Sequence, residues 1–384
     1  MLSKKDEMEE VYIINTSSFL PNTAITNDVI EEYMGFINGT VSRTKNLILR
    51  NNKIKERYYA IDKDGNSTHS NAEMVSLAIR KLLENNIDPI ELLACGTSSP
   101  DQLMPSHGVM VHGELPELGS IEVVSPSGVC CSGMHALKYS FLSIKTGDKK
   151  TAISTGSERL AKTLRSENYQ EELEAITKVE EKPILAFEKD FLRWMLSDGA
   201  GAFLLNNTPN KDSHSLRIEW MEAISYADDQ PVCMYMGSDF DEHGKLLSYK
   251  DYSQEDLIKK SIFSIKQDTK VLGEKIVRLG FDKLADICKK HNYDPSTVDH
   301  FLPHLSSFFF EDKIDEVLRS NDIIIPREKW FTNLATKGNV GSGSIYLMVD
   351  ELFKSDKLSK GETILLAVPE SSRFSYVFCL LTVV

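Results

Sequence analysis

Residues 127–137 read Ser-Gly-Val-Cys-Cys-Ser-Gly-Met-His-Ala-Leu and place two adjacent cysteines where a predicted strand meets a predicted helix. Residues 121–124 are typical of a strand, and residues 134–144 carry apolar side chains at helical spacing. Cys130 is therefore expected at or just before a helix N-terminus. Unpaired amides and the dipole at that end favour an anion, so we expect a lowered pKa for Cys130 and a nucleophilic thiol. A buried structural cysteine is the competing interpretation.

The composition is that of a long acidic chain. It has 384 residues, with 44 Lys and Arg against 57 Asp and Glu, and a net charge of −13. This balance disfavours nucleic acid and anionic membranes as partners. A charged beginning and the lack of a long apolar run predict no membrane span and a cytoplasmic location. Six scattered cysteines without a Cys-x-x-Cys pair indicate free thiols, and no metal or cofactor is expected.

The order of predicted elements indicates a layered α/β fold. Strand-like runs at residues 11–15, 92–96, 121–124, 151–155 and 202–205 alternate with helical patterns such as residues 72–86. A polar segment at residues 206–212 interrupts this pattern, so we divide the chain into halves, 1–210 and 211–384.

The second half repeats part of the first. A Ser-Gly turn, a helix and a strand follow one another at residues 131–155 and again at residues 341–368, which predicts a duplicated βαβ-type unit. We also expect helices at residues 254–279 and 281–291 and a strand at residues 298–302. Residues 237–254 are interpreted as a surface loop, with the border of a substrate channel as the alternative. A site at the junction of the halves would draw residues from both.

Two further residues are candidates for chemistry. His304 follows the predicted strand, at an edge where loops of an α/β sheet converge. Asn339 lies in a Gly-rich turn that opens a helix, so its amide could face the same crevice. Taken alone, His304 is more typical of a core or surface histidine, and Asn339 of a turn residue.

Together these segments resemble the thiolase superfamily, and within it the ketoacyl-ACP synthase III branch of condensing enzymes. The resemblance covers nearly the whole chain and rests on an ordered set of motifs: Gly96-Thr97-Ser98-Ser99, Met104-Pro105-Ser106, the Cys130 turn, Ser154-Thr155-Gly156-Ser157-Glu158, Ser197-Asp198-Gly199-Ala200-Gly201-Ala202, Pro303-His304 and Gly338-Asn339. It implies two βαβαβαββ halves forming a five-layered αβαβα sandwich.

The resemblance also implies functional residues. The family's catalytic Cys, His and Asn correspond to Cys130, His304 and Asn339, with Cys131 as nucleophile if the correspondence slips by one residue. The Ser197–Ala202 motif is interpreted as close-packed support. Met104 corresponds to a position that reaches into the partner's acyl pocket, so a homodimer is expected.

The chain departs from the family in its C-terminal loop, at residues 51–57, and after His304, where no Arg follows in the expected place. The family's C-terminal run of glycines is replaced by Pro369-Glu370-Ser371-Ser372-Arg373-Phe374-Ser375-Tyr376, so we expect Ser371, Ser372, Arg373 and Phe374 to contact the substrate. The family's nucleotide-binding Trp and its Gly-Ile-Arg turn are altered at residues 51–57. The expected partners are thioesters of an acyl carrier protein or of coenzyme A, and these changes make a carrier protein or another acyl donor more plausible than coenzyme A.

The implied activity is acyl transfer to Cys130 followed by condensation with a malonyl- or β-ketoacyl-thioester. His304 and Asn339 would stabilise the enolate as carbon dioxide leaves. The departures favour secondary lipid or polyketide synthesis, for example of the dialkylresorcinol type. Two alternatives stay open: acyl transfer to an oxygen or nitrogen nucleophile without decarboxylation, and a non-catalytic subunit of a heteromeric condensing complex.

Overall fold

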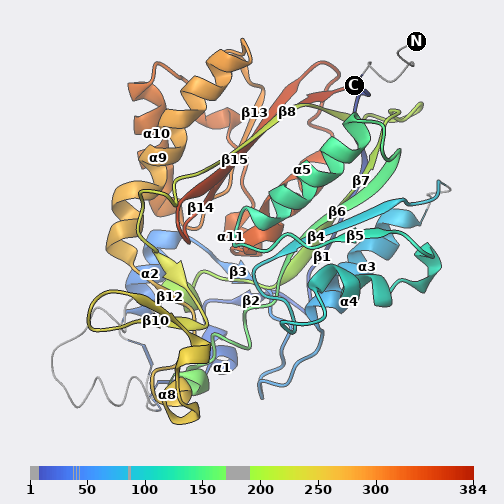
Figure 1. The fold of residues 1–384 in the computed structure, drawn as a ribbon. Helices are drawn as coiled ribbons and strands as arrows, with labels where there is room; N and C mark the ends of the chain where they lie inside the picture. Colours follow the sequence, from blue (N-terminus) through green and yellow to red (C-terminus); the bar gives the residue numbers. More distant parts are fainter. Residues whose placement is uncertain (1–7, 38, 40, 43, 85–87, 170–190) are drawn as a thin grey trace.

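The computed structural model describes residues 8–37, 39, 41–42, 44–84, 88–169 and 191–384. In this part of the chain the main sheet has nine strands in the order β13-β14-β15-β8-β1-β7-β6-β4-β5 (Figure 1). Their bounds are β1 Tyr12–Phe19, β4 Leu92–Thr97, β5 Glu122–Val124, β6 Thr151–Glu158, β7 Gly199–Asn206, β8 Leu216–Ser225, β13 His300–Pro303, β14 Thr363–Glu370 and β15 Ser375–Val383.

The strand order repeats between the two halves. In the first half β4 is parallel to β6, which pairs antiparallel with β7, and β7 pairs antiparallel with β1. In the second half β13, β14, β15 and β8 follow the same scheme. Strands β1 and β8 join the two sets through a short antiparallel pairing. This repetition is consistent with a division at residues 210 and 211, which stays a prediction.

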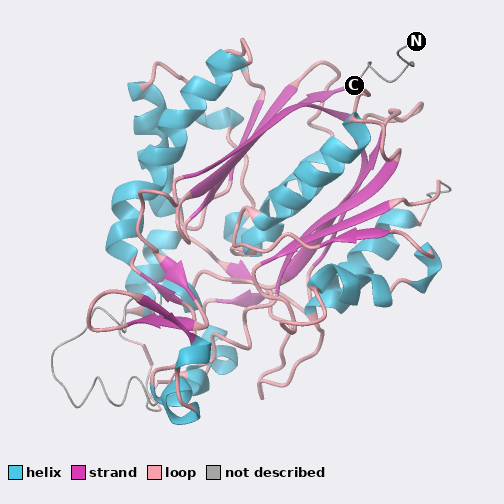
Figure 2. Ribbon diagram, viewed as in Figure 1, coloured by secondary structure: helices cyan, strands magenta, loops and turns pink. Residues whose placement is uncertain are grey.

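The helices complete five layers, as the resemblance implied (Figures 1 and 2). Helices α5 (Ser132–Lys145) and α12 (Ser344–Phe353) share one apolar core with inward side chains of β7, β14 and β15. Helices α3 (Asn71–Leu83) and α4 (His107–Gly113) cover the outer face of the first half. Helices α9 (Thr269–Lys290) and α10 (Glu311–Ser320) cover the outer face of the second.

Smaller elements surround this core. The short helices are α1 Ile30–Met34, α2 Lys45–Asn52, α8 Gln254–Lys259 and α11 Leu334–Lys337, and the short strands are β2 Ile25–Thr26, β3 Glu56–Arg57, β9 Met234–Tyr235, β10 Ser238–Phe240, β11 Leu246–Ser248 and β12 Lys266–Gln267. No helix among the described residues is long and apolar enough to cross a membrane.

The predicted boundary between helices at residues 254–279 and 281–291 is wrong: the helical segment breaks earlier, between α8 and α9. Helix α8 ends at Lys259, β12 intervenes, and α9 then runs unbroken through Gly280. Gly280 does not interrupt the helix: a Cβ there would lie 2.3 Å from the ring of Tyr376, so the glycine permits close packing on β15. The predicted end of the helix at residues 72–86 lies partly outside the described residues.

The backbone is closely packed at two glycines beside the central helices, and one of these contacts joins the two halves. A Cβ on Gly96, in β4, would lie 2.2 Å from the carbonyl oxygen of Ser132. A Cβ on Gly156, in β6, would lie 2.3 Å from the carbonyl oxygen of Ser342, which belongs to the other half. Only glycine allows these distances. The cysteine turn and the turn that follows Asn339 are therefore held against the same strand ends.

Candidate active site

Cys130 lies in the turn between β5 and α5, two residues before the helix begins, as the sequence predicts. Its side chain is only 8% exposed. Burial raises the pKa of the thiol well above its ordinary value, and the negative charges of Glu370 and Glu158 raise it further. The lowered pKa expected from the helix N-terminus is therefore wrong. Desolvation and two carboxylates outweigh the partial charge of the helix end.

Glu370, at the end of β14, holds the turn that carries Cys130. Its Oε2 atom accepts hydrogen bonds from the backbone amides of Val129 and Cys131, each at 2.9 Å. Its Oε1 atom accepts a hydrogen bond from the Ser372 hydroxyl at 2.8 Å. Both carboxylate oxygens of Glu370 thus accept hydrogen bonds, two of them from backbone amides just before α5.

The two adjacent cysteines have different surroundings. Cys131 is fully buried, and its thiol donates a hydrogen bond to the carbonyl oxygen of Val368 at 3.3 Å. Cys130 instead borders two cavities. All six cysteines of the chain are free thiols. The geometry thus makes Cys130 the more accessible of the pair.

His304 directly follows β13, and its backbone amide donates to the carbonyl oxygen of Ala367 in β14 at 2.8 Å. Burial lowers the pKa of the imidazole to about 4, so the ring is neutral near pH 7. Its Nε2 atom is buried and has no hydrogen-bond partner in the described structure. A neutral imidazole with an unused nitrogen can exchange a hydrogen bond with a bound ligand.

Asn339 follows α11 and the positive-φ residue Gly338. Its Oδ1 atom accepts a hydrogen bond from the Gly341 amide at 2.9 Å. The Asn339 backbone amide donates to Met195 at 3.0 Å, and its carbonyl accepts from the Ser197 amide at 2.9 Å. These bonds fix the side chain at the cavity edge and leave its Nδ2 group as the donor for a ligand.

Two cavities meet at Cys130. The larger has a volume of about 230 Å³ and includes Asn339, Ser98 and a mainly apolar wall. The smaller, of about 40 Å³, includes His304 and apolar side chains of α9 and α10. Cys130, Ser306 and Ser371 border both. The three residues of the expected triad, from distant parts of the sequence, therefore border two adjacent cavities that share Cys130.

Of the other residues predicted to contact the substrate, some border the cavities and some lie elsewhere. Ser371 borders both cavities, and Ser372 binds Glu370 beside them. Arg373 is exposed and donates from Nε to the carbonyl oxygen of Gln230 at 2.9 Å. Phe374 is fully buried in the apolar core near α9 and borders neither cavity. Met104 is 86% exposed and also lies outside both cavities.

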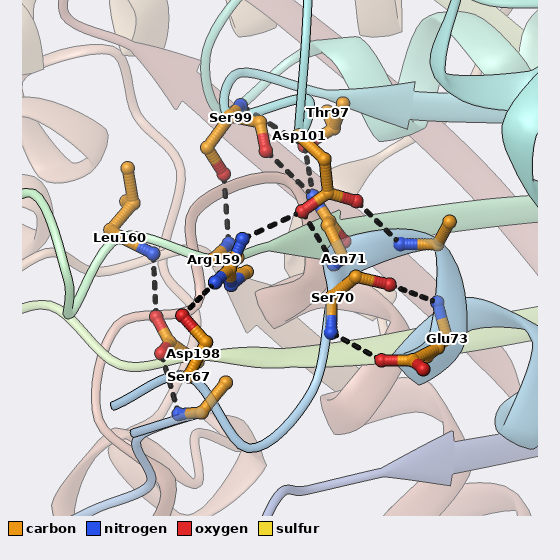
Figure 3. A network of polar contacts seen from close by, with 12 residues as sticks. Ser67, Ser70, Asn71, Glu73, Thr97, Ser99, Asp101, Arg159, Leu160 and Asp198 are labelled. Atoms are coloured by element: carbon orange, nitrogen blue, oxygen red, sulfur yellow. Dashed lines mark hydrogen bonds and ion pairs between the residues drawn. The ribbon is translucent and has the colours of Figure 1, made fainter. Parts of the chain in front are cut away.

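Figure 3 shows a polar network around Arg159, Asp101 and Asp198, and Leu160, which Asp198 holds, lines the larger cavity. Asp198 accepts hydrogen bonds from the amides of Leu160, Ala161 and Ala60 at 2.6, 3.0 and 2.8 Å. Asp101 accepts from Arg159 at 2.9 Å. Leu160 itself lines the cavity. The Ser197–Ala202 motif thus has the supporting geometry expected of it.

Sequence reasoning missed three features of the site. Glu158 is a buried carboxylate that accepts from both Ser98 and Ser99 hydroxyls at 2.6 Å. Residues 234–236 line the larger cavity, although a surface loop was preferred for the segment that follows them. Gln267 lines it as well. Glu158 is the only charged residue of β6 and could have been singled out for that reason, whereas nothing local signals Gln267.

A third cavity, of about 190 Å³, lies where the family's nucleotide-binding turn is altered. Asn51 and Asn52 border it together with Phe309 and Phe310. No Lys or Arg of the described residues is among its lining side chains. Phosphate groups are usually bound by such cations, so this cavity has little to offer a nucleotide.

Comparison with known proteins shows which enzymes this chain resembles in sequence. The family model for the C-terminal part of 3-oxoacyl-[acyl-carrier-protein] synthase III matches residues 288–368, which include His304 and Asn339. The chain is 23% identical over 363 residues to beta-ketoacyl-[acyl-carrier-protein] synthase III of Clostridium botulinum, covering 94% of each chain.

Solved structures agree on the fold. AbyA1, a tetronic acid condensing enzyme, superposes with a TM-score of 0.72 at 17% identity, covering 97% of this chain and 99% of that one. OleA of Xanthomonas campestris, solved with lauric acid and lauroyl-CoA, gives a TM-score of 0.70 at 16% identity, covering 98% and 99%.

The fold is that of the solved 3-oxoacyl-[acyl-carrier-protein] synthase III structures. Over nearly its whole length the chain is similar to these condensing enzymes, at 23% identity to the curated relative, so its sequence is divergent from theirs.

Proposed function

We propose that Cys130 accepts an acyl group from a thioester and that the acyl-Cys130 is joined to a malonyl- or β-ketoacyl-thioester. The observation that carries this proposal is that His304 and Asn339 each line one of two cavities that share Cys130. The unpartnered Nε2 atom of His304 supports it, because a buried polar atom left without a bond fits a site that a ligand completes.

The first step is a thioester exchange. The sulfur of Cys130 attacks the carbonyl carbon of the acyl donor, and the bond from that carbon to the donor sulfur breaks. The proton of the Cys130 thiol ends on the departing thiol. The Cys130 backbone amide would form part of the oxyanion hole that stabilises the tetrahedral intermediate.

The second step forms a carbon–carbon bond. With a malonyl donor, the bond to the carboxylate breaks, carbon dioxide leaves, and the electron pair forms an enolate of the thioester. His304 Nε2–H and Asn339 Nδ2–H would donate hydrogen bonds to the enolate oxygen. The enolate carbon then attacks the acyl carbonyl, and the Cys130 thiolate leaves and is reprotonated.

The thioester partner is proposed to be an acyl carrier protein in preference to coenzyme A. The cavity at Asn51 and Asn52 supports this choice, because no cationic side chain of the described residues lines it.

Secondary lipid or polyketide synthesis, of the dialkylresorcinol type for instance, is the proposed pathway class. The replacement of the glycine loop at residues 369–376 supports it, as does the structural likeness to a tetronic acid condensing enzyme. A cytoplasmic location and a homodimer stay predictions.

Intact-mass measurement tests the acylation step. The protein is mixed with acyl-carrier-protein or acyl-CoA thioesters, and wild type is compared with Cys130→Ala and Cys131→Ala. We expect one acyl adduct in wild type and in Cys131→Ala, and none in Cys130→Ala. An adduct lost only in Cys131→Ala would shift the nucleophile by one residue. No adduct with either class of thioester would leave the non-catalytic subunit as the better account.

A further inference from the structure

We infer that Gln267, with Ser371, forms a polar subsite in the apolar cavity beside Cys130, and that it binds a hydrogen-bond donor, O–H or N–H, of the thioester ligand. This inference rests on the proposed acylation of Cys130. Gln267 ends β12, whose partner strand β9 also contributes to the cavity wall. Gln267 and Cys130 line the same cavity although 137 residues separate them in sequence.

The Gln267 amide is only half satisfied. Its Nε2 atom donates to the Ser371 hydroxyl oxygen at 3.1 Å. Its Oε1 atom is buried and has no hydrogen-bond partner among the described residues. The residue is 4% exposed. A buried acceptor without a partner destabilises a fold, so its presence at a cavity wall indicates a role with ligand.

The apolar surroundings of Gln267 Oε1 favour a ligand that is apolar except for one hydrogen-bond donor. The remaining wall of the cavity is dominated by apolar side chains: Leu160, Leu192, Met195, Leu196, Met236 and Ile265. The Ser371 hydroxyl accepts from Gln267 Nε2 at 3.1 Å, and as a donor it makes only a weak contact of 4.0 Å to the Met234 sulfur. The terminal torsion of a glutamine is soft, so a small rotation brings Oε1 toward a ligand in the cavity. An apolar chain with one donor group matches this wall.

Two sources carry such a donor: a hydroxyl on the acyl chain, or an amide N–H on the arm that presents the thioester. Three probes separate them. These are decanoyl-N-acetylcysteamine, its 3-hydroxydecanoyl counterpart, and the decanoyl thioester of methyl 3-mercaptopropionate, which has no donor. The rate of Cys130 acylation is measured by intact mass for wild type and for Gln267→Met, which keeps the length of the side chain and removes the amide.

The chain offers a matched control in Gln230→Met. Gln230 is also buried, but Lys275 and Asp229 bind its amide, and it borders neither of the cavities that meet at Cys130. We expect Gln230→Met to keep wild-type preferences among the probes and to lose stability. Gln267→Met, which removes an unsatisfied acceptor, is expected to unfold no more easily than wild type.

A wild-type preference of about tenfold for one donor-bearing probe, lost in Gln267→Met, would establish the subsite and its ligand group. Preference for the hydroxy-acyl probe over its decanoyl counterpart assigns the chain hydroxyl. Preference for the cysteamine over the ester-thiol probe assigns the amide. Equal preferences in wild type and Gln267→Met overturn the inference. Absence of any wild-type adduct would instead refute the acylation of Cys130.

Discussion

The carboxylate of Glu370 accepts a hydrogen bond from the backbone amide of Cys131 at 2.9 Å, joining residues that lie 239 positions apart. Glu370 also accepts a hydrogen bond from the Val129 amide. The residues on both sides of Cys130 are therefore bound to the same carboxylate. The end of β14 therefore sets both the geometry of the cysteine turn and its electrostatic potential. Glu370 lies in the segment 369–376, where the resemblance implied a run of glycines, and its charge fixes the cysteine turn.

Replacing Glu370 by Gln is expected to lower the pKa of Cys130. The negative charge of Glu370 is the second largest cause that raises this pKa, after burial, and Gln removes the charge while keeping an oxygen acceptor. A larger thiolate fraction at a given pH speeds alkylation by iodoacetamide, followed at Cys130 by peptide mass mapping across pH 7–10. Glu158→Gln should shift the profile less. Identical profiles for wild type and Glu370→Gln would contradict this electrostatic account.

Replacing His304 or Asn339 by Ala is expected to slow malonyl-thioester decarboxylation by about 100-fold each, as for the loss of one preorganised oxyanion donor. Release of carbon dioxide measures the rate. Formation of acyl-Cys130 serves as the control, because it shows that each variant is folded and binds thioester. Undiminished decarboxylation would remove both residues from the enolate step and favour acyl transfer to an oxygen or nitrogen nucleophile.

Stability is expected to fall as the pH decreases from about 6.5 to about 4. Burial lowers the pKa values of His107 and His304 to about 4 in the folded protein, whereas the unfolded chain binds these protons near 6.5. The unfolded state then holds more protons in this range, which costs about 3 kcal/mol of unfolding free energy for each histidine. Urea denaturation at several pH values measures the slope, and His107→Gln should flatten it. An unchanged slope in that variant would count against the buried neutral histidine.

Two glycines of α9 are expected to respond in opposite directions to Ala. A Cβ on Gly280 would lie 2.3 Å from the Tyr376 ring, so Gly280→Ala should lower the unfolding free energy by about 1–3 kcal/mol. Gly273 has no heavy atom within 4 Å of such a Cβ, so Gly273→Ala should raise it by up to about 1 kcal/mol. Denaturant titration compares them, and equal effects would disprove the packing role of Gly280.

The predicted homodimer is expected to depend on Met104. This side chain is 86% exposed and its neighbour Leu103 is 72% exposed, so both are available to contact a second chain. Met104→Glu should shift the protein from dimer to monomer in sedimentation velocity. Ile324→Glu, at a 54% exposed apolar position in the second half, is the control and should leave the dimer intact. A monomeric wild type, or a dimeric Met104→Glu variant, would refute the prediction.

The sequence by itself determined the order of the layers and the identity of the main site candidates. Strand and helix periodicity depends on local side-chain spacing, so the cysteine turn before α5 and the strand before His304 could be predicted. The repeat of turn, helix and strand indicated the duplication that the strand order now displays. The motif order indicated Cys130, His304 and Asn339 before any distance between them was known.

Only the tertiary structure decided the state of the nucleophile and the walls around it. The lowered pKa expected for Cys130 followed from its local helix position, but burial and Glu370, which comes from the far end of the chain, reverse the shift. Arg373 and Phe374 neighbour Ser371 in sequence, yet the turn sends one to the surface and the other into the core. Gln267 reaches the cavity through strand pairing with β9. Desolvation, charge and long-range pairing depend on which segments pack together, and local sequence does not contain that information.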